Sequence, residues 1–444
     1  MPNKVNQYVD IPISQDSFAP PSAKSHLNQY KEQVQQVPPL PSFCDQVIDT
    51  IPHSLYGADR MLHIAQVLEK ISKSQITELQ TIIEYFMRYM LVKGASDLDM
   101  GGPACNNCIW LRIDGHKRKH IELGYYTPDQ SNVLLLSLLT ESQRTDLLGA
   151  YGLDISRQIK AGRDGGVWHR YRTSMYFDNE HLAFNIRAIS NELRPIDSLG
   201  FHPTIKQGLM FDHVRDGLTL ITGVTGSGKS TTLDTIVDEN NSRVDGHIVV
   251  IAKPIEFIHL SKRSIVRHRE VGKDVASFHQ GVVQALRQDP DIIVIGEMRD
   301  PQTISAALEV TDSGHKVFST LHTSSAVESV ARIVAEYDKA EQERVRNRLA
   351  DVLRCIISQK LLPKIGGGRV LAKEVLWVTP SVRAAIKGNN LDEIYQMMWE
   401  GRAQGQHTLE QDLFRLMKQR QIDRNVGMDY ANNKKRLAQL LGMM

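Results

Sequence analysis

The feature that most constrains the fold is the segment 223–230, which reads GVTGSGKS. It matches the P-loop pattern GxxxxGK[ST], and it lies between an apolar, strand-like run at 218–221 and an expected helix that begins near residue 231. Glycines let backbone N–H groups approach phosphate oxygens closely, and the N-terminus of the following helix attracts the same anion. The segment therefore predicts a strand–loop–helix unit that binds nucleotide phosphates.

The residue types within this segment indicate the ligand. The Lys229 ammonium can reach the β- and γ-phosphates, and the Ser230 hydroxyl can ligate Mg²⁺. We therefore expect ATP and Mg²⁺ as cofactors. The expected nucleotide-binding residues are Gly223, Thr225, Gly226, Ser227, Gly228, Lys229, Ser230 and Thr231. The alternative is a Gly-rich turn at a strand end that binds nothing, and the surrounding strand and helix patterns disfavour it.

Four apolar runs around the P-loop predict the sheet that carries it. They lie at 218–222, 247–252, 292–295 and 316–320, and helical patterns separate them. Strands that alternate with helices favour a mostly parallel sheet with crossover helices. We therefore expect an α/β fold for this part of the chain.

Three of these predicted strands end at candidate catalytic residues. Glu297 follows the third strand, where P-loop proteins place an acidic group beside the metal. Glu256 follows the second strand, where a carboxylate can orient or deprotonate the attacking water. His322 follows the fourth strand and can hydrogen-bond the γ-phosphate. Either glutamate could instead be a solvated side chain at a strand end. A structural role is favoured for His315, which lies at the other end of its strand from His322.

Changes in pattern along the chain predict four regions. Residues 1–58 contain several prolines and a polar run, so we expect an extended or partly disordered arm. Two amphipathic helices followed by short alternating strands predict a smaller α+β domain over 59–195. The P-loop domain is expected over 196–380, and a helical C-terminal region with a tail over 381–444.

Charge and hydropathy limit the classes of partner. The chain has 53 basic and 51 acidic residues, a net charge of +2 that gives no bulk attraction to nucleic acid or to anionic membranes. It lacks a signal-peptide pattern and any apolar run of about 18 residues, so we expect a cytoplasmic protein without a transmembrane segment. Cys105 and Cys108 have CxxC spacing, but no second pair completes a zinc site, so reduced thiols in a surface turn are expected.

Taken together, these motifs resemble the type II/type IV secretion ATPase superfamily, and most closely its PilT-like branch of pilus retraction, type IVB secretion and conjugation ATPases. The likeness runs from about residue 94 to about residue 416. The motifs that carry it are a Walker A motif at 223–233, an atypical Walker B motif at 296–300, the end of an Asp box at 254–257 and a His box at 314–323.

The resemblance implies a RecA-like P-loop ATPase domain preceded by a PAS-like domain. It implies Glu256 as the catalytic carboxylate, Glu297 as a metal ligand or partner base, and His322 as a γ-phosphate sensor. Arg172 and Arg187 stand where the family's PAS-like domain supplies arginines to ATP, and such cations suit the charge of the γ-phosphate. The alternative for both arginines is a surface ion pair.

Two departures from the family pattern bear on turnover and on the branch. The Asp box usually reads Glu-Asp-Pro before Ile-Glu, and here Ala252 and Lys253 occupy its first two positions. We still expect hydrolysis, with slower turnover or altered metal affinity as a consequence of the missing acids. The segment 381–388 matches the retraction-motor signature only in part, at Arg383 and Ile386, which leaves room for a secretion or conjugation relative.

The function implied by the resemblance is a homohexameric motor that couples ATP hydrolysis to pilus retraction or to type IV secretion and conjugative transfer. Inner-membrane platform or secretion-channel proteins would hold it at the membrane, and nucleotide bound between its domains would stabilise a closed arrangement. One alternative is a nucleotide-binding regulatory subunit with weak hydrolysis. Another is a nucleic-acid motor, which the near-neutral charge disfavours, so no direct nucleic-acid contact is expected.

Overall fold

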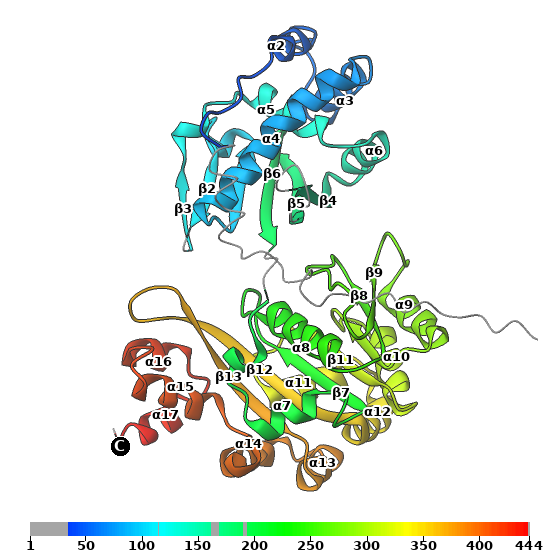
Figure 1. Cartoon of the computed structure of the whole chain (residues 1–444), viewed down its shortest axis with the longest axis vertical. Helices are drawn as coiled ribbons and strands as arrows, with labels where there is room; N and C mark the ends of the chain where they lie inside the picture. The colour runs from blue at the N-terminus through cyan, green and yellow to red at the C-terminus, as the bar shows by residue number, and fades with distance from the viewer. Residues whose placement is uncertain (1–33, 114, 161–167, 190–192, 443–444) are drawn as a thin grey trace, which may run out of the picture. The chain divides into compact units, whose positions relative to one another are not determined.

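The computed structural model describes residues 34–113, 115–160, 168–189 and 193–442 (Figure 1). The chain divides into two compact units, Met1–Ser190 and Asn191–Met444, which we call the N-terminal and C-terminal units. The predicted domain boundary at residue 195 lies close to this division. None of the helices within the described ranges combines the length and the apolar character that a bilayer crossing needs.

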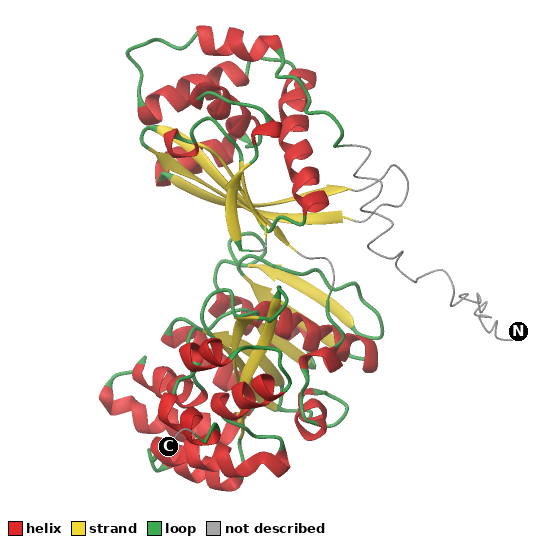
Figure 2. Cartoon of the chain, turned by 90° about the vertical axis from the view of Figure 1, so that its left-hand side faces the viewer, coloured by secondary structure: helices red, strands yellow, loops and turns green. Residues whose placement is uncertain are grey.

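The N-terminal unit consists of a six-stranded antiparallel sheet in the order β3-β2-β1-β6-β5-β4, with helices packed against it (Figure 2). The strands are β1 (Asp97–Gly101), β2 (Trp110–Ile113), β3 (His116–Lys119), β4 (Gly152–Lys160), β5 (Trp168–Asp178) and β6 (His181–Ile189). The helices are α2 (Ser42–Asp49), α3 (Gly57–Leu68), α4 (Lys73–Lys93), α5 (Pro128–Ser137) and α6 (Glu141–Ala150), with short 3-10 turns at η2 (Pro103–Cys105) and η3 (Ile121–Leu123).

Local sequence explains how these elements begin and pack. Three helices start at capping boxes, in which the side chains of Ser72, Thr127 and Thr140 accept a hydrogen bond from the backbone three residues later. These bonds satisfy N–H groups that a helix N-terminus leaves unpaired. Large side chains from the strands, Tyr171 and Phe184 among them, are fully buried with residues of the helices in one core.

The region predicted as an arm is ordered in its described part. Residues 1–33 of that region lie outside the described residues. Helix α2 forms within the rest, and its side chains Cys44 and Val47 are buried in the core of the N-terminal unit. Because the helix is short and follows a proline, its few apolar residues gave no clear helical period in the sequence. Its order therefore comes from tertiary packing.

The CxxC pair, Cys105 and Cys108, lies in the N-terminal unit. Among the described residues, no cluster of three or more His, Cys, Asp or Glu side chains is arranged to hold a metal ion. Cys108 is buried and Cys105 is half-buried, so the turn is less exposed than the sequence indicated. Both thiols are free, and burial raises the pKa of Cys105 to about 11, which keeps it protonated at neutral pH.

The C-terminal unit contains a seven-stranded sheet in the order β13-β12-β7-β11-β10-β8-β9, parallel except for the β12–β13 pair. The strands are β7 (Gly217–Thr222), β8 (His247–Ala252), β9 (Ile265–Glu270), β10 (Ile292–Ile295), β11 (Lys316–Leu321), β12 (Leu353–Pro363) and β13 (Arg369–Trp377). The helices are α7 (Pro203–Leu209), α8 (Lys229–Arg243), α9 (Phe278–Ala285), α10 (Pro301–Asp312), α11 (Ala326–Ala335), α12 (Lys339–Val352), α13 (Pro380–Lys387), α14 (Leu391–Glu400), α15 (Leu409–Lys418), α16 (Arg424–Tyr430) and α17 (Lys434–Leu440), with 3-10 turns at η4 (Ile196–Leu199), η5 (Leu286–Gln288) and η6 (Gly401–Gln404).

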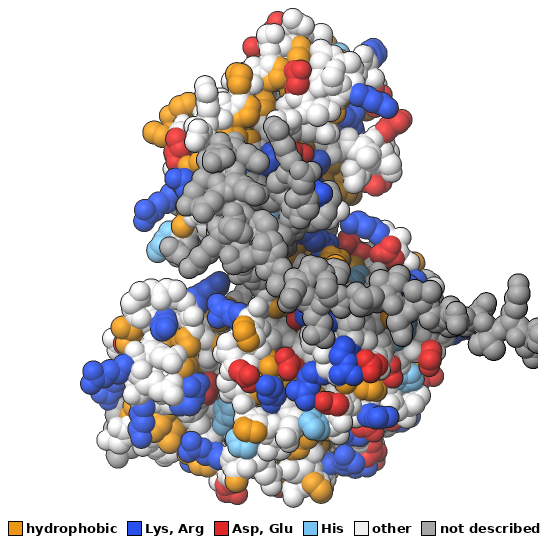
Figure 3. Space-filling model, in the orientation of Figure 1, with side chains coloured by type: hydrophobic (Ala, Val, Ile, Leu, Met, Phe, Trp, Pro, Cys, Tyr) orange, Lys and Arg blue, Asp and Glu red, His pale blue; other side chains and the backbone are white. Residues whose placement is uncertain are grey.

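Helices cover both faces of this sheet, as Figure 1 shows. The strands are continuous apolar runs because both of their faces are buried. In β10, for example, Ile292 and Val294 pack with α7 and α8, whereas Ile293 and Ile295 pack with α9 to α14. On the surface, the face of this unit seen in Figure 3 carries both basic and acidic side chains.

A buried carboxyl group joins the sheet to the C-terminal helices. Glu374, on β13, accepts a hydrogen bond of 2.6 Å from the backbone N–H of Ala326, the first residue of α11. Burial raises the pKa of Glu374 to about 7, although hydrogen bonds from the Ala326 and Leu409 backbone oppose this shift; the charge of Glu410 adds to it. The protonated form is therefore favoured in the folded state well above the ordinary pKa of a glutamic acid.

This carboxyl group should make the stability of the protein depend on pH. Because the folded state holds the Glu374 proton to a higher pH than the unfolded state, unfolding free energy should fall between about pH 4.5 and pH 7 and then level off. Glu374→Gln keeps the hydrogen-bond acceptor without the charge, so it should exceed the wild type in unfolding free energy by about 3 kcal/mol at pH 8 and match it near pH 5. Urea unfolding at both pH values, with the exposed Glu309→Gln on α10 as a control, measures this difference. Parallel pH dependences for wild type and Glu374→Gln would contradict it.

Candidate nucleotide site

The parallel sheet brings the predicted site segments to one edge. Strands β7, β11, β10 and β8 are consecutive neighbours, and they pair in parallel. Their carboxyl ends lead directly into the P-loop, His322, Glu297 and the segment that contains Glu256. In parallel α/β sheets, ligands bind outside the carboxyl ends of the strands. The candidate site is therefore built from four segments that are far apart in the sequence.

Glycine conformation shapes the P-loop. Gly223, Gly226 and Gly228 have φ values of 146°, 81° and 89°, which residues with a side chain rarely adopt. A Cβ atom on Gly223 would also collide with the carbonyl oxygen of Gln359 and the hydroxyl of Ser227. Gly228 immediately precedes α8, whose first residue is Lys229. The N–H groups at the start of α8 are thereby directed at the site, where an anion would bind.

Lys229 is held against the loop itself. Its Nζ atom donates hydrogen bonds to the carbonyl oxygens of Gly223, at 2.7 Å, and Val224, at 3.2 Å. Burial lowers the pKa of Lys229, while the charges of Glu297 and Glu256 act in the opposite direction. The two acids are therefore close enough to interact with this ammonium group, as a shared site requires.

Glu297 and His322 are in direct contact. The Glu297 Oε1 atom lies 3.3 Å from Nε2 of His322 and 2.6 Å from Nε of Arg299. Burial lowers the pKa of His322, and the positive charges of Lys229 and Arg299 lower it further, against the opposing charge of Glu297. His322 is consequently a neutral imidazole at pH 7, with one N–H that can be donated either to Glu297 or to a phosphate oxygen.

Glu256 and Lys253 differ from Glu297 in their surroundings. Both side chains are exposed, and within the described ranges neither forms an ion pair or a side-chain hydrogen bond. Glu256 is thus available to contact water or substrate.

Close packing at this edge is made possible by Gly296, because a Cβ atom there would lie 3.1 Å from the Cβ of Ala252. The side chain of Ala252 is small enough for the two strand ends to meet.

The donor set fits a magnesium ion. Mg²⁺ prefers oxygen ligands, usually one or two carboxylates together with substrate phosphates and water. The hydroxyl of Ser230 and the carboxylate of Glu297, which is 17% exposed, supply such atoms from the start of α8 and the end of β10. Assignment of the ion to these two residues stays a prediction.

One neighbour of the P-loop could not be identified from the sequence. Gln359, on β12, is buried and donates a hydrogen bond of 3.0 Å from Nε2 to the carbonyl oxygen of Ser227. Its Oε1 atom, the Ser227 hydroxyl and the Thr222 hydroxyl are buried and have no hydrogen-bond partner among the described residues. Gln359 belongs to no recognised motif, and only the pairing of β12 with β7 brings it to the site.

Arg172 and Arg187 belong to the N-terminal unit, where they face each other across β5 and β6. Arg187 Nε lies 2.8 Å from Asp97 Oδ1, and an Arg172 guanidinium nitrogen lies 3.4 Å from Asp154 Oδ2. Both arginines therefore form the ion pairs that were the alternative interpretation. Their side chains are nevertheless 41% and 58% exposed, which leaves donors free for another group. A role toward ATP stays a prediction.

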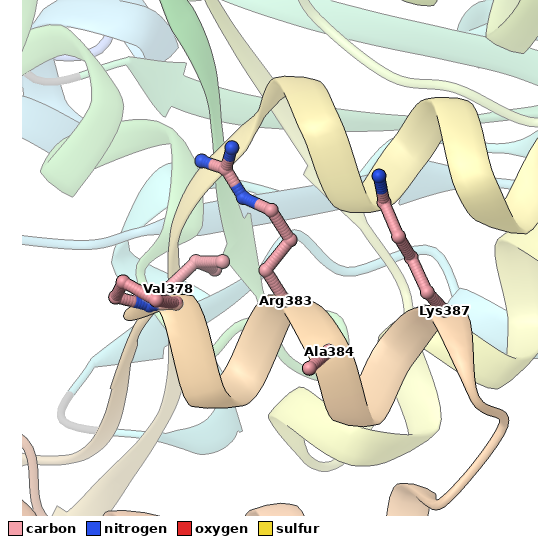
Figure 4. Close-up of a pocket in the computed structure, with 5 residues that line it drawn as sticks. Val378, Arg383, Ala384 and Lys387 are labelled. Atoms are coloured by element: carbon pink, nitrogen blue, oxygen red, sulfur yellow. The ribbon is translucent and has the colours of Figure 1, made fainter.

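A separate pocket of about 320 Å³ lies beside α13 (Figure 4). It is lined by Val378, Pro380, Arg383, Ala384 and Lys387. Because β13 runs antiparallel to β12, α13 begins at the opposite edge of the sheet from the P-loop. This pocket is therefore not part of the nucleotide site.

Comparison with known proteins identifies the family. The family model described as type II/IV secretion system protein matches residues 176–404. The type IV pilus retraction ATPase PilT of Pseudomonas aeruginosa is 37% identical over 333 residues, which are 74% of this chain and 92% of that protein. The chain belongs to the type II/IV secretion system protein family. The pilus ATPase PilU of the same organism is 30% identical, over 79% of this chain and 88% of that protein.

Solved structures of this family support the same assignment. The pilus retraction motor PilT with bound ADP has 36% identity and a TM-score of 0.71, over 80% of this chain and 98% of that one. The ATPase DotB of Legionella pneumophila has 25% identity and a TM-score of 0.65, over 85% of this chain and 96% of that one. The predicted PilT-like branch, the RecA-like fold with an N-terminal domain and the ATPase activity are confirmed. The roles of individual site residues stay predictions.

Proposed function

We propose that the protein is a homohexameric motor that uses ATP hydrolysis to power pilus retraction or a type IV secretion or conjugation machine. The observation that carries this proposal is the meeting of Lys229, Glu297 and His322 at the carboxyl edge of the sheet, beside an exposed Glu256. This arrangement provides phosphate binding, a carboxylate for a metal and a carboxylate for water in one place. The motor function itself is inferred from membership of the family.

Each residue then has a distinct task. The N–H groups of the P-loop and Lys229 bind the phosphates, and Ser230 with Glu297 holds Mg²⁺, which neutralises phosphate charge when bound. Glu256 accepts a proton from the attacking water, because its carboxylate is not engaged by other described side chains. His322 donates its one N–H to the γ-phosphate when that phosphate is bound and to Glu297 when it is absent, so release of the phosphate changes the surroundings of both residues.

The proposal also gives a role to two arginines of the N-terminal unit and includes partner proteins at the membrane. Arg172 and Arg187 supply positive charge to the γ-phosphate through the donors that their ion pairs leave free. Inner-membrane platform or secretion-channel proteins hold the hexamer at the membrane. Retraction is favoured over secretion, since the identity to PilT is 36–37% against 25% to DotB.

Dependence of activity on protein concentration tests the motor assignment. If a ring of subunits is the active form, turnover per subunit should fall steeply when the protein is diluted to a verified monomer. ATPase rates should be measured across a dilution series, with mass measured by light scattering on the same samples. A rate per subunit that stays constant down to the monomer would contradict the hexameric motor and favour the regulatory subunit with weak hydrolysis.

A further inference from the structure

His259 lies three residues beyond Glu256, in the segment that connects β8 to β9. Its side chain is fully buried, with an exposed fraction of 0%. The ring nitrogen Nε2 lies 3.2 Å from Oδ1 of Asp234, and Nδ1 lies 3.9 Å from Oδ1 of Asp238. Both aspartates belong to α8, the helix that begins at the P-loop. A single buried ring is thus placed between two carboxylates of that helix.

One face of α8 carries all of these contacts. Ser230, the two aspartates and Asn241 recur at helical spacing and so share that face. Asn241 donates from Nδ2 to the carbonyl oxygen of Leu260, at 2.7 Å, and accepts from the N–H of Lys262, at 3.0 Å. The segment beyond Glu256 is therefore attached to α8 at two places, and the same helix face bears the expected metal ligand.

The charges around His259 favour its protonated form. Burial lowers the pKa of His259, but the hydrogen bond to Asp234 and the charges of Asp234 and Asp238 outweigh burial, so the pKa is raised above its usual value. The Nδ1 atom, which faces Asp238 at 3.9 Å, has no hydrogen-bond partner among the described residues, so that contact is an ion pair alone. Lys262, in the same segment, is paired with Asp238 at 2.8 Å. On β9, Nε2 of His268 accepts a hydrogen bond of 3.0 Å from the His259 backbone N–H, and the two rings stack with centroids 5.7 Å apart.

We propose that His259 is a positioning residue for ATP hydrolysis, whose imidazolium clamps the Glu256 segment onto the P-loop helix. The inference rests on the proposed role of Glu256 as the catalytic carboxylate. A general base acts only within hydrogen-bond reach of the proton it removes, and a displacement of about 1 Å lowers rates by up to about 100-fold. The clamp fixes the distance between Glu256 and a triphosphate bound at the start of α8.

The pH dependence of this clamp has a definite sign. Below its raised pKa, His259 is charged and both ion pairs are complete. As the pH rises through that pKa, the ring loses its proton and the attraction to the two carboxylates is lost. Turnover should therefore fall at alkaline pH, while the P-loop contacts that bind ATP are unchanged.

The test compares full-length wild type with His259→Gln, Glu256→Gln and His315→Gln, by steady-state kinetics and ATP affinity from about pH 6 to about pH 9. His315→Gln is the control, because its ring contacts Ser313 and Val310 at the opposite end of β11. His259→Gln should lower kcat by about 10-fold or more and lack the alkaline decline, with KM and ATP affinity within about twofold of wild type. The control should behave as wild type.

Several results would overturn the clamp. If His259→Gln has the same kcat and pH profile as the wild type, the clamp is refuted. If His259→Gln loses ATP affinity and kcat in parallel, the role of His259 is structural and the clamp is refuted as well. If His259→Gln does not fold, Asp238→Asn should move the alkaline decline to lower pH, and an unmoved decline refutes the clamp. Full activity of Glu256→Gln would overturn the proposed catalytic role together with the clamp. An inactive Glu256→Gln beside a wild-type-like His259→Gln would overturn the clamp alone.

Discussion

Lys229→Ala should weaken ATP binding by about 10- to 100-fold and abolish measurable turnover, the range expected when a charge-assisted hydrogen bond of about 1.5–3 kcal/mol is lost. The structure gives two reasons. The ammonium group is buried at the edge where the phosphates would bind, and its hydrogen bonds to the Gly223 and Val224 carbonyls also support the shape of the loop. Removal of the side chain takes away both the charge and the support.

The measurement is a titration with a fluorescent ATP analogue in the presence of Mg²⁺. Lys418→Ala provides a matched control, since this lysine is exposed on α15 and belongs to no site described above. The control should bind as wild type does. Unchanged affinity in Lys229→Ala would mean that the nucleotide does not bind at the P-loop.

Glu256→Gln should lower kcat by about 10²- to 10⁴-fold, the usual contribution of a general base. ATP affinity should stay within about twofold of wild type, because the Glu256 side chain is exposed and supports no other described side chain. Steady-state ATPase assays measure the loss, with the exposed Glu309→Gln on α10 as the matched control. Near-normal turnover in Glu256→Gln would remove this residue from the chemistry.

The contacts of the two acids explain why Glu256 rather than Glu297 is assigned to water. Glu297 is held by Arg299 and His322, so its carboxylate is fixed and partly neutralised. Both contacts are made by the Oε1 atom of Glu297, which leaves Oε2 as the oxygen for a metal ion. Glu256 has no such partner among the described side chains. The exposed position of Lys253 places a cation where the family usually has an acid, so the residual metal affinity depends on Glu297 and Ser230.

Much of the C-terminal unit followed from local sequence signals. The P-loop pattern predicts the strand before it and the helix after it. Continuous apolar runs, typical of strands with both faces buried, predicted the neighbouring strands. Parallel pairing then places the residues that follow those strands, Glu297 and His322 among them, at one edge of the sheet. In the structure, Nε2 of His322 lies 3.3 Å from Oε1 of Glu297. The catalytic roles remain to be tested.

The interactions that escaped prediction are non-local. Gln359 contacts Ser227 across 132 residues of sequence, and nothing in β12 marks it as a neighbour of the P-loop. His259 was overlooked because Asp234 and Asp238 have the pattern of solvated helix residues, and only the fold of the β8–β9 connection buries a histidine between them. Helix α2 was missed for a similar reason, since tertiary packing and not periodicity orders it.

A single-turnover assay, in which enzyme in excess is mixed with labelled ATP and Mg²⁺, tests the central claim most directly. The claim is that ATP bound at the P-loop is hydrolysed with the help of Glu256. Wild type should convert the bound ATP to ADP, whereas Glu256→Gln should retain bound ATP and hydrolyse it at least about 100-fold more slowly. Equal rates in the two proteins, or no hydrolysis by wild type, would contradict this account.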